Sequence, residues 1–239
     1  MRGSVSLVRT DFLDTFRDRR LDACAGGVPP GSTPVTGGRG AARVLSTHPF
    51  GDIVVRPYLR GGWIRHLVQR RYFLGARAFR ELQVTERLRA AAAPVPEVLA
   101  AVQRRARFGP GYHACIVTRR IAGTIPAAVA LQRARSGEVR LLMEQIGRSV
   151  RECHEARGWH ADLNAWNLLI PEARPELPVI VIDWDRGRYM EAGVPYQARR
   201  SNLERLRRSL NKLGLTTALD GWPALEDGYD RPPNPDPAA

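Results

Sequence analysis

A polar turn and the short apolar strand that follows it constrain this chain more than any other feature. Residues 159–170 read Trp-His-Ala-Asp-Leu-Asn-Ala-Trp-Asn-Leu-Leu-Ile. Residues 179–183 are a run of β-branched residues that ends in Asp183, which is typical of a short buried strand. We expect Asp162 and Asn167 of the turn and Asp183 at the end of the strand to converge on one site.

These three side chains suit phosphoryl transfer from ATP. The reaction needs a carboxylate to orient and deprotonate a hydroxyl, and an amide and a second carboxylate to hold Mg²⁺ against the phosphates. The spacing His-x-Asp-x-x-x-x-Asn is that of a kinase catalytic loop. The sequence therefore predicts Asp162 as the catalytic base, Asn167 and Asp183 as metal ligands, and Asp185 as support for a second ion or the acceptor.

Other interpretations of this region are weaker. Asp162 could cap a helix in an ordinary polar turn, but this does not explain why Asp183 and Asp185 follow a strand. A regulated protein kinase is disfavoured, because the segment after Asp183 is too short for an activation loop and Ala161 stands where such kinases carry arginine. We expect His160 to position the loop rather than to act as a base.

Length, apolar runs and cysteines limit the class of protein. The chain has 239 residues, enough for a buried core in one domain or two small lobes. Its apolar runs are too short to span a bilayer and its first residues lack a signal peptide, so we expect it to stay in the cytoplasm. Cys24, Cys115 and Cys153 are scattered and odd in number, which predicts reduced buried thiols without a disulfide framework or a zinc site.

The charge balance favours anionic partners. Lysine and arginine total 37 against 24 aspartates and glutamates, which gives a formal net charge of +13. Nearly all of the cations are arginines, because Lys212 is the only lysine. A positive field of this size attracts nucleic acid, a phospholipid surface or a phosphorylated substrate.

Residues 35–58 are expected to bind nucleotide phosphates. Gly37, Gly38 and Gly40 permit a tight strand–turn–strand whose N–H groups approach phosphates closely. Their spacing is not Gly-x-Gly-x-x-Gly, so a plain flexible hairpin is the alternative. Arg56, on the next strand, stands where kinases place a lysine, and its guanidinium fork suits phosphate oxygens. A surface arginine is the competing interpretation.

A helix predicted at residues 77–89 supplies a partner for Arg56. Glu81 on this helix is the first candidate and Glu86 the second, although either could be a solvated helix charge. Between strand and helix, residues 60–73 interleave arginines with aromatic and aliphatic residues. That pattern suits an anionic membrane surface and an ordinary amphipathic helix equally.

The same patterns divide the chain into regions. A helix at residues 138–158 leads into the polar turn, and a hinge between lobes is expected near residues 118–124. The first region should be poorly defined apart from a short helix around residues 11–25. The last region is rich in Pro, Gly and Asp, which predicts disorder. The regions are an N-terminal extension at 1–30, an N-lobe at 31–120, a C-lobe at 121–219 and a disordered tail at 220–239.

Several sequence blocks occur in order along the chain. They are Val-Val-Arg-Pro-Tyr-Leu-Arg-Gly-Gly (54–62), Arg-Ala-Phe-Arg-Glu (77–81), His-Ala-Asp-Leu-Asn-Ala-Trp-Asn-Leu-Leu-Ile (160–170), Ile-Asp-Trp-Asp-Arg-Gly (182–187) and Asn-Leu-Glu-Arg-Leu-Arg-Arg-Ser-Leu-Asn-Lys-Leu (202–213). Together they resemble the bacterial 3-deoxy-D-manno-octulosonic acid (Kdo) kinases of the lipopolysaccharide kinase group, over roughly residues 35–215. Departures are modest: Trp184 stands where phenylalanine is expected, and Leu59 interrupts a basic run.

This resemblance implies an α+β, two-lobed protein-kinase-like fold with a β-rich N-lobe and a mainly helical C-lobe. It implies ATP with Mg²⁺ and transfer of phosphate to the 4-hydroxyl of Kdo on a lipid A precursor, at the cytoplasmic face of the inner membrane. By position, Asp162 resembles the catalytic base and Asn167 and Asp183 the metal ligands. Arg56 resembles an arginine of the same block in this family.

Charge supports an acidic acceptor independently, because Kdo is a sugar acid and lipid A carries phosphates. We therefore expect the Kdo-bearing lipid A precursor and the anionic inner-membrane surface as partners, and no nucleic acid. The alternatives are a heptose kinase of the same group, another small-molecule kinase, or a basic pseudokinase that binds membrane or RNA without turnover. An aminoglycoside kinase has polycationic substrates, which this chain would repel.

Overall fold

The computed structural model describes residues 4–35, 42–58, 77–106, 112–174 and 176–231. The chain divides into two compact units. Unit 1 contains residues 1–86 and 96–121, and unit 2 contains residues 87–95 and 122–239. The last crossing from one unit to the other follows Ile121, within the stretch where the sequence predicts a hinge.

Unit 1 is built on an antiparallel sheet. Among the described residues, six strands pair in the order β1-β5-β6-β4-β3-β2. The first five residues of β5 and the middle four of β6 are buried on both faces, which explains why each strand contains a continuous apolar run rather than an alternating one. The strands are β1 (Ser4–Val8), β2 (Thr33–Pro34), β3 (Arg43–Thr47), β4 (Gly51–Pro57), β5 (Val98–Arg105) and β6 (Tyr112–Arg119).

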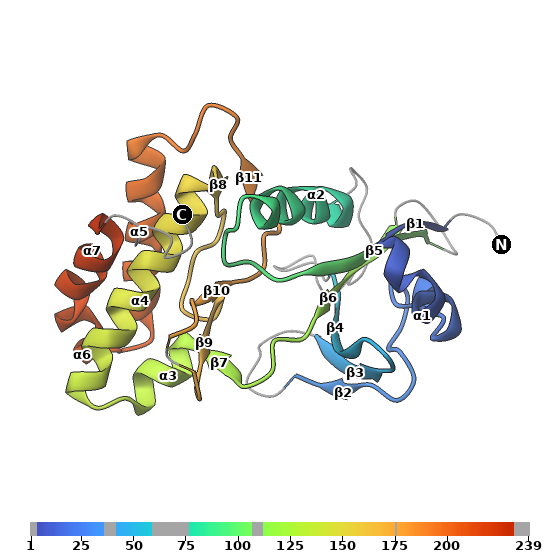
Figure 1. Ribbon diagram of the computed structural model, residues 1–239, viewed down its shortest axis with the longest axis horizontal. Helices are drawn as coiled ribbons and strands as arrows, with labels where there is room; N and C mark the ends of the chain where they lie inside the picture. Colours follow the sequence, from blue (N-terminus) through green and yellow to red (C-terminus); the bar gives the residue numbers. More distant parts are fainter. Residues whose placement is uncertain (1–3, 36–41, 59–76, 107–111, 175, 232–239) are drawn as a thin grey trace, which may run out of the picture. The chain divides into compact units, whose positions relative to one another are not determined.

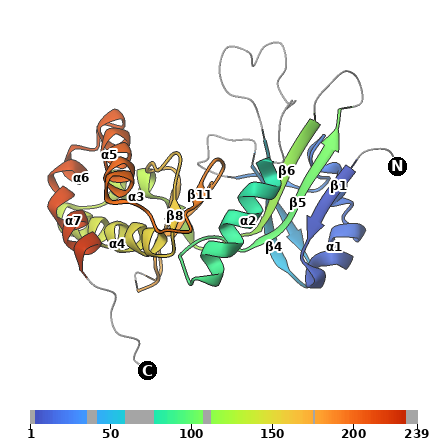
Figure 2. The ribbon, with the colours of Figure 1, turned by 90° about the horizontal axis from the view of Figure 1, so that it is seen from above.

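Both faces of this sheet are covered by other parts of unit 1. On one face, Phe12 of the N-terminal segment packs in a cluster with Cys115. On the other face, Ala78 of α2 (Arg77–Ala90) packs in a cluster with Ile116. Successive side chains of a strand point to opposite faces of the sheet, so Cys115 and Ile116 of β6 pack in different clusters. Figure 2 shows α2 on one side of the strands and the N-terminal helix on the other.

The N-terminal segment is an integral part of unit 1. β1 pairs antiparallel with β5 along its whole length. Two short 3-10 helices, η1 (Thr10–Phe12) and η2 (Leu21–Ala23), flank α1 (Leu13–Asp18), within the region where the sequence predicts a short helix. The prediction of a poorly defined extension at 1–30 is therefore wrong for its described part, because Phe12 and Leu21 complete the core of the sheet.

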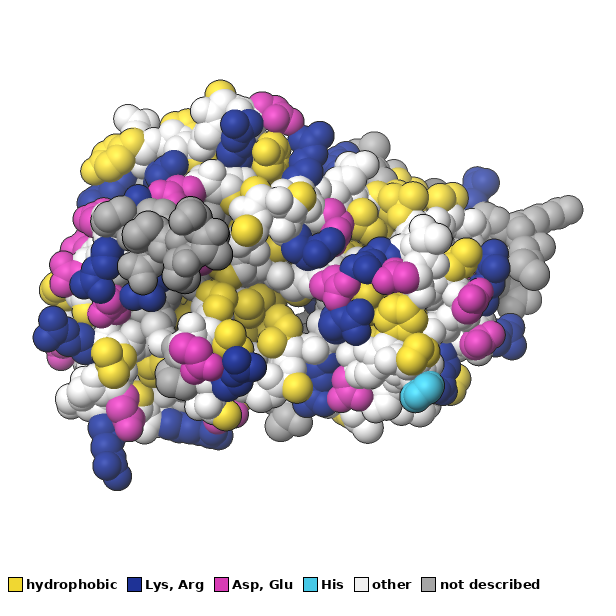
Figure 3. Space-filling view, in the orientation of Figure 1, with side chains coloured by type: hydrophobic (Ala, Val, Ile, Leu, Met, Phe, Trp, Pro, Cys, Tyr) yellow, Lys and Arg dark blue, Asp and Glu magenta, His cyan; other side chains and the backbone are white. Residues whose placement is uncertain are grey.

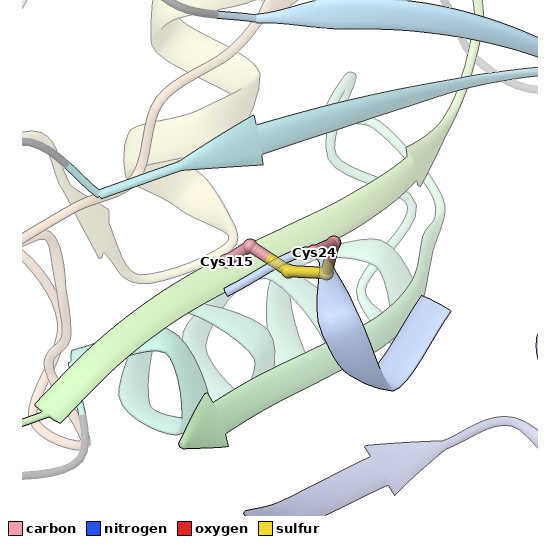
Figure 4. The surroundings of a disulfide bond; sticks show 2 residues. All are labelled: Cys24 and Cys115. Carbon is pink, nitrogen blue, oxygen red and sulfur yellow. A yellow bond between two sulfur atoms is a disulfide. The ribbon is translucent and has the colours of Figure 1, made fainter. Parts of the chain in front are cut away.

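A disulfide joins Cys24 to Cys115 (Figure 4). Their Cα atoms lie 6.2 Å apart although 91 positions separate them in the sequence. The prediction of reduced thiols is wrong for this pair, because scattered spacing does not reveal which cysteines the fold brings together. Cys153 is a free, buried thiol in unit 2, and burial raises the pKa of that thiol.

The structure describes the flanks of the predicted phosphate-binding turn. β2 and β3 pair antiparallel, and the Val35 N–H donates to the Ala42 carbonyl oxygen at 3.1 Å. The basic and aromatic segment at residues 60–73 lies outside the described residues. So do the predicted phosphate-binding glycines, which are Gly37, Gly38 and Gly40.

Unit 2 is mainly helical (Figure 1). α4 (Ser136–Glu155) buries Val139, Met143, Ile146 and Val150 at intervals of three and four, as the sequence predicts. A β-rich unit and a helical unit together make the predicted α+β class. The other helices are α3 (Ala127–Arg133), α5 (Tyr196–Lys212), α6 (Thr216–Asp220) and α7 (Trp222–Asp230).

Glycines bring the backbones of α4 and α7 into contact. A Cβ added at Gly147 of α4 would lie 2.9 Å from the Tyr229 nitrogen and would also meet the Leu225 carbonyl oxygen. A Cβ at Gly228 of α7 would lie 2.8 Å from the carbonyl carbon of Glu144. Both distances are shorter than an ordinary van der Waals contact, so only glycine fits at these two positions.

The helix α7 corrects the prediction of a disordered tail at 220–239. Trp222 and Leu225 are buried, and the helix continues to Asp230. Composition rules count Pro, Gly and Asp toward disorder, whereas here Gly228 permits the close packing of two helices. Residues 232–239 lie outside the described residues.

Short strands complete the described part of unit 2. One antiparallel sheet contains β7 (Thr124–Pro126), β9 (Leu168–Pro171) and β10 (Ile180–Val181), and β8 (Gly158–Trp159) pairs with β11 (Arg188–Tyr189). The polar turn therefore lies between β8 and β9. Within the described ranges, no helix combines the length and apolar character needed to cross a membrane.

We expect Gly228→Ala to destabilise the protein by about 1–3 kcal/mol, because the added methyl group would overlap the backbone of α4. Gly137→Ala on α4 is the matched control, since nothing lies within 4 Å of a Cβ there, and alanine favours a helix over glycine by about 1 kcal/mol. Urea unfolding measures both effects. A Gly228→Ala protein as stable as the wild type would contradict the close contact.

Candidate functional site

The polar turn between β8 and β9 is closed by its own side chains. The carbonyl oxygen of Asp162 accepts hydrogen bonds from the side-chain amides of Asn164 and Asn167, each at 2.9 Å. The amide oxygen of Asn164 accepts from the Trp166 N–H, also at 2.9 Å. Such short-range bonds favour a turn over a regular element. They hold Asp162, which is exposed, and Asn167, which is half-buried, on one loop.

Asp183 is brought to this turn by the sheet. β9 pairs with β10, and just beyond the pairing the Ile182 N–H donates to the Asn167 carbonyl oxygen at 2.9 Å. Asp183 is the next residue, and its φ of 63° lies in the left-handed region. Among residues other than glycine, Asp and Asn adopt this conformation most readily. The chain therefore turns sharply at Asp183, beside the polar turn.

The buried side chain of Trp184 stabilises the turn that begins at Asp183. Its side chain is buried, and its indole N–H donates to the Val181 carbonyl oxygen at 2.9 Å. The Gly187 N–H donates back to the Trp184 carbonyl oxygen at 2.8 Å. The indole and the His160 ring pack in a T-shaped arrangement, with centroids 4.8 Å apart. The tryptophan that departs from the family pattern thus braces both the turn and His160.

The structure places the predicted residues of unit 2 on adjoining backbone segments. Asp162 and Asn167 share the polar turn, and Asp183 follows the residue that bonds to Asn167. Asp185 lies in the turn after Asp183 and is half-buried. The catalytic and metal-binding roles of these four residues stay predictions.

His160 has a defined protonation state. Its Nδ1 lies 3.1 Å from the Asp162 nitrogen, and its Nε2 lies 3.0 Å from the Ile182 carbonyl oxygen. A backbone N–H can only donate and a carbonyl can only accept, so His160 is neutral with its proton on Nε2. Burial lowers the pKa of His160 and outweighs the hydrogen bond to Ile182. The ring links the two turns, which fits the predicted positioning role.

Asn202 of α5 holds the backbone of His160. Its side chain is completely buried; Oδ1 accepts from the His160 N–H at 3.1 Å, and Nδ2 donates to the His160 carbonyl oxygen at 2.8 Å. The same Oδ1 lies 3.1 Å from Nε2 of His154, whose Nδ1 lies 2.7 Å from the Tyr229 hydroxyl. A chain of hydrogen bonds therefore runs from α7 to the polar turn.

The same series of hydrogen bonds also determines the protonation state of His154. The Asn202 oxygen can only accept, so His154 carries its proton on Nε2 and accepts from Tyr229 at Nδ1. Burial lowers the pKa of His154 to about 4 and raises the pKa of Tyr229. Sequence reasoning missed Asn202, which is 42 positions from His160. The only signal was its place at the start of the block at 202–213.

The oxygen donors of the two turns fit a hard divalent cation. Asn167 uses its side-chain nitrogen on the Asp162 carbonyl, which leaves its amide oxygen as the donor atom for a cation. Mg²⁺ in such sites takes one or two carboxylates together with substrate phosphates. In the part of the chain that the structure describes, no three His, Cys, Asp or Glu side chains gather into a metal site.

The predicted pair of Arg56 and Glu81 is present in unit 1. Nη2 of Arg56 lies 2.6 and 2.7 Å from the two carboxylate oxygens of Glu81. The Tyr58 hydroxyl donates to the same carboxylate, and the guanidinium lies 4.9 Å from the Tyr58 ring centroid. The Glu81 side chain is 6% exposed and that of Arg56 26%, so a buried carboxylate orients a more accessible cation. Glu86, the alternative partner, accepts from the Val98 N–H at 3.3 Å.

The fold of the chain is kinase-like. A solved structure described as WaaP in complex with acyl carrier protein matches 96% of this chain and 90% of that chain, with a TM-score of 0.62 and 22% sequence identity. At this identity the match confirms the kinase-like fold alone.

The sequence comparisons identify the family. A model of the lipopolysaccharide kinase (Kdo/WaaP) family matches residues 36–229. The chain is 37% identical over 202 residues to the 3-deoxy-D-manno-octulosonic acid kinase of Xylella fastidiosa strain 9a5c, covering 81% of this chain and 77% of that protein. It is 35% identical over 203 residues to the enzyme of the same name from Haemophilus influenzae strain 86-028NP, covering 80% and 82%. The chain belongs to the lipopolysaccharide kinase (Kdo/WaaP) family.

We expect the unfolding free energy to fall as the pH is lowered from about 6.5 toward 4. The folded protein keeps His154 neutral, with a pKa of about 4, whereas an unfolded histidine titrates near pH ~6.5. The unfolded state therefore takes up the proton first and is favoured, by up to about 3 kcal/mol for this residue. Urea unfolding at a series of pH values measures the slope.

His154→Gln should make that slope shallower over the same pH window, because one proton no longer distinguishes the two states. His48→Gln, which makes the same substitution at an exposed histidine of unit 1, is the matched control. Equal slopes for the wild type and His154→Gln would contradict the neutral, buried state of His154.

Proposed function

We propose that this chain is an ATP-dependent kinase that phosphorylates the 4-hydroxyl of Kdo on a lipid A precursor, in the synthesis of the lipopolysaccharide core. One observation carries the proposal: the hydrogen bond between Ile182 and Asn167, which brings the end of β10 to the polar turn. It sets Asp183 beside the loop that holds Asp162. The names of the relatives support Kdo as the acceptor sugar.

Asp162 acts on the acceptor hydroxyl. Its N–H donates to His160 and its carbonyl oxygen accepts from Asn164 and Asn167, while the residue itself is exposed. The carboxylate takes the proton of the hydroxyl, whose oxygen bonds to the γ-phosphorus of ATP. The bond from that phosphorus to the β–γ bridging oxygen breaks, and ADP leaves. A backbone held by these hydrogen bonds presents the carboxylate with little reorganisation.

Asn167 and Asp183 would hold Mg²⁺, and Asp185 would support a second ion or the acceptor. When bound, the cation neutralises charge that develops on the phosphates. The contribution of the protein is to keep the donor atoms in place. The bond from Asn167 to the carbonyl of Asp162 and the left-handed turn at Asp183 restrict where those two side chains can go.

Arg56 neutralises phosphate charge in place of the lysine that this chain lacks at that position. A guanidinium is always charged and offers donors in a planar fork, which suits phosphate oxygens. Glu81 and Tyr58 keep it oriented. The N–H groups around Gly37, Gly38 and Gly40 are proposed to contact the phosphates as well.

A cationic protein suits this acceptor and its surroundings. Kdo is a sugar acid and lipid A carries phosphates, so a net charge of +13 raises the rate of encounter with such a surface. In Figure 3, Lys and Arg side chains are scattered over the visible face among carboxylates rather than gathered in one patch. Attraction by the net charge of the chain, at the cytoplasmic face of the inner membrane, is the form of membrane association that we propose.

We expect Asp162→Asn to lower kcat by about a hundred- to ten-thousandfold, because an amide cannot accept the hydroxyl proton. Asp227→Asn, which changes an exposed residue of α7, is the matched control and should retain full activity. The measurement is transfer of labelled γ-phosphate from ATP to a Kdo-bearing lipid A precursor and to the same precursor without Kdo. Equal labelling of the two acceptors would rule out Kdo, and full activity of Asp162→Asn would remove the catalytic assignment.

Arg56→Gln should reduce kcat/KM for ATP about ten- to a hundredfold, the effect of losing a charge-assisted hydrogen bond. Glu81→Gln should shift it in the same direction, because the guanidinium loses its buried counter-charge. Arg105→Gln, an exposed arginine on β5 of the same sheet, is the control. An unchanged kcat/KM for ATP in Arg56→Gln would remove the phosphate-binding assignment of Arg56.

A further inference from the structure

α5 carries cations on the flank that contacts the polar turn. The Ser209 hydroxyl accepts a hydrogen bond from the Ala165 N–H at 3.2 Å. Arg205 lies four residues before Ser209 and Lys212 three residues after it, and side chains at these spacings are neighbours on a helix surface. Arg208 stands at the same spacings from Arg205 and Lys212. These three residues are called the α5 cationic stripe below.

The stripe is attached to the loop that carries the proposed chemistry. Ala165, which contacts Ser209, lies in the polar turn between Asp162 and Asn167. Asn202, on the same helix, holds the backbone of His160 at the start of the turn. α5 therefore binds the turn at two points, and a helix is rigid over this length. The backbone of the helix that carries the stripe is thus anchored to the polar turn.

No member of the stripe forms an ion pair in the described part of the chain. Arg208 and Lys212 are exposed, whereas Arg205 is half-buried and its Nε has no hydrogen-bond partner among the described residues. By contrast, Arg151 on α4 pairs with Glu155. A partly buried cationic donor without an acceptor is costly in the free protein. An anionic ligand at the stripe would offset that cost.

We infer that the α5 cationic stripe binds the acidic groups of the acceptor. The inference rests on the proposed kinase function and adds to it a subsite for the second substrate. The acceptor offers a sugar carboxylate and lipid phosphates, and both present anionic oxygens that guanidinium and ammonium groups bind well. Binding at the stripe holds the acceptor against the polar turn, where a hydroxyl can reach Asp162.

Steady-state kinetics of charge-removing variants test the inference. Arg205→Gln and Lys212→Gln should each raise the KM for the Kdo-bearing precursor about tenfold, the typical effect of a charge-assisted hydrogen bond, and leave the KM for ATP as it is. Arg205→Lys should restore part of the affinity. Arg200→Gln is the matched control: it removes the same charge from the same helix, about two and a half turns before Ser209 and so on the opposite side.

Two acceptors distinguish the source of the negative charge. If the stripe binds the Kdo carboxylate, the tenfold rise in KM persists with a precursor whose phosphates have been removed. If it binds a lipid phosphate, the rise disappears with that precursor. Either result supports the stripe. An unchanged acceptor KM in every stripe variant, or an equal rise in Arg200→Gln, would overturn it.

Calorimetric binding of the precursor without ATP separates this inference from the proposed function. Suppose that the wild type transfers no phosphate but binds the precursor about tenfold more tightly than Arg205→Gln. The kinase proposal would then fail while the stripe stands. Transfer by the wild type, with binding and KM unaffected in the stripe variants, would sink the stripe and leave the kinase proposal intact.

Discussion

The candidate site depends on one buried amide. Asn202 satisfies both the N–H and the carbonyl of His160, the residue at which β8 gives way to the polar turn. Leaving such a buried backbone group without a partner would cost about 1–3 kcal/mol, so α5 and the turn stay together. His160 extends the constraint through its own ring, to the Asp162 N–H on one side and the Ile182 carbonyl on the other. One side chain thus governs both segments that carry carboxylates.

Local patterns in the sequence predicted the elements that carry the site. Each of these elements is encoded by a short run of consecutive residues, so the spacing of residue types alone identifies it. They are the polar turn, the apolar strand before Asp183 and the helix that carries Glu81. The pairing of Arg56 with Glu81 was predictable for a related reason: the chain offered few acidic candidates on one nearby helix. The left-handed conformation of Asp183 was not predictable, because spacing and propensity do not fix the φ of a single residue outside a regular element.

Contacts between distant segments were beyond a reading of the sequence. No local pattern around Asn202 predicts its hydrogen bonds to His160, which is 42 positions away, and none around Cys24 predicts its disulfide with Cys115. The tail shows the same limit in another form. A glycine in a polar, proline-rich stretch indicates disorder by composition, but Gly228 lies where two helix backbones touch. The role of such a residue depends on the element that packs against it, and that element lies far away in the sequence.

The last helix has a role that its position at the end of the chain conceals. Tyr229 donates a hydrogen bond to His154, His154 donates to Asn202, and Asn202 accepts from the His160 N–H. These three consecutive bonds connect α7 to the polar turn. Truncation of the protein after residue 219 would remove the Tyr229 hydroxyl that donates to His154. It would also expose to solvent the surface of α4 that α7 covers. Damage at the C-terminus, whether by proteolysis or by a premature stop, would therefore affect the polar turn without altering any residue in it.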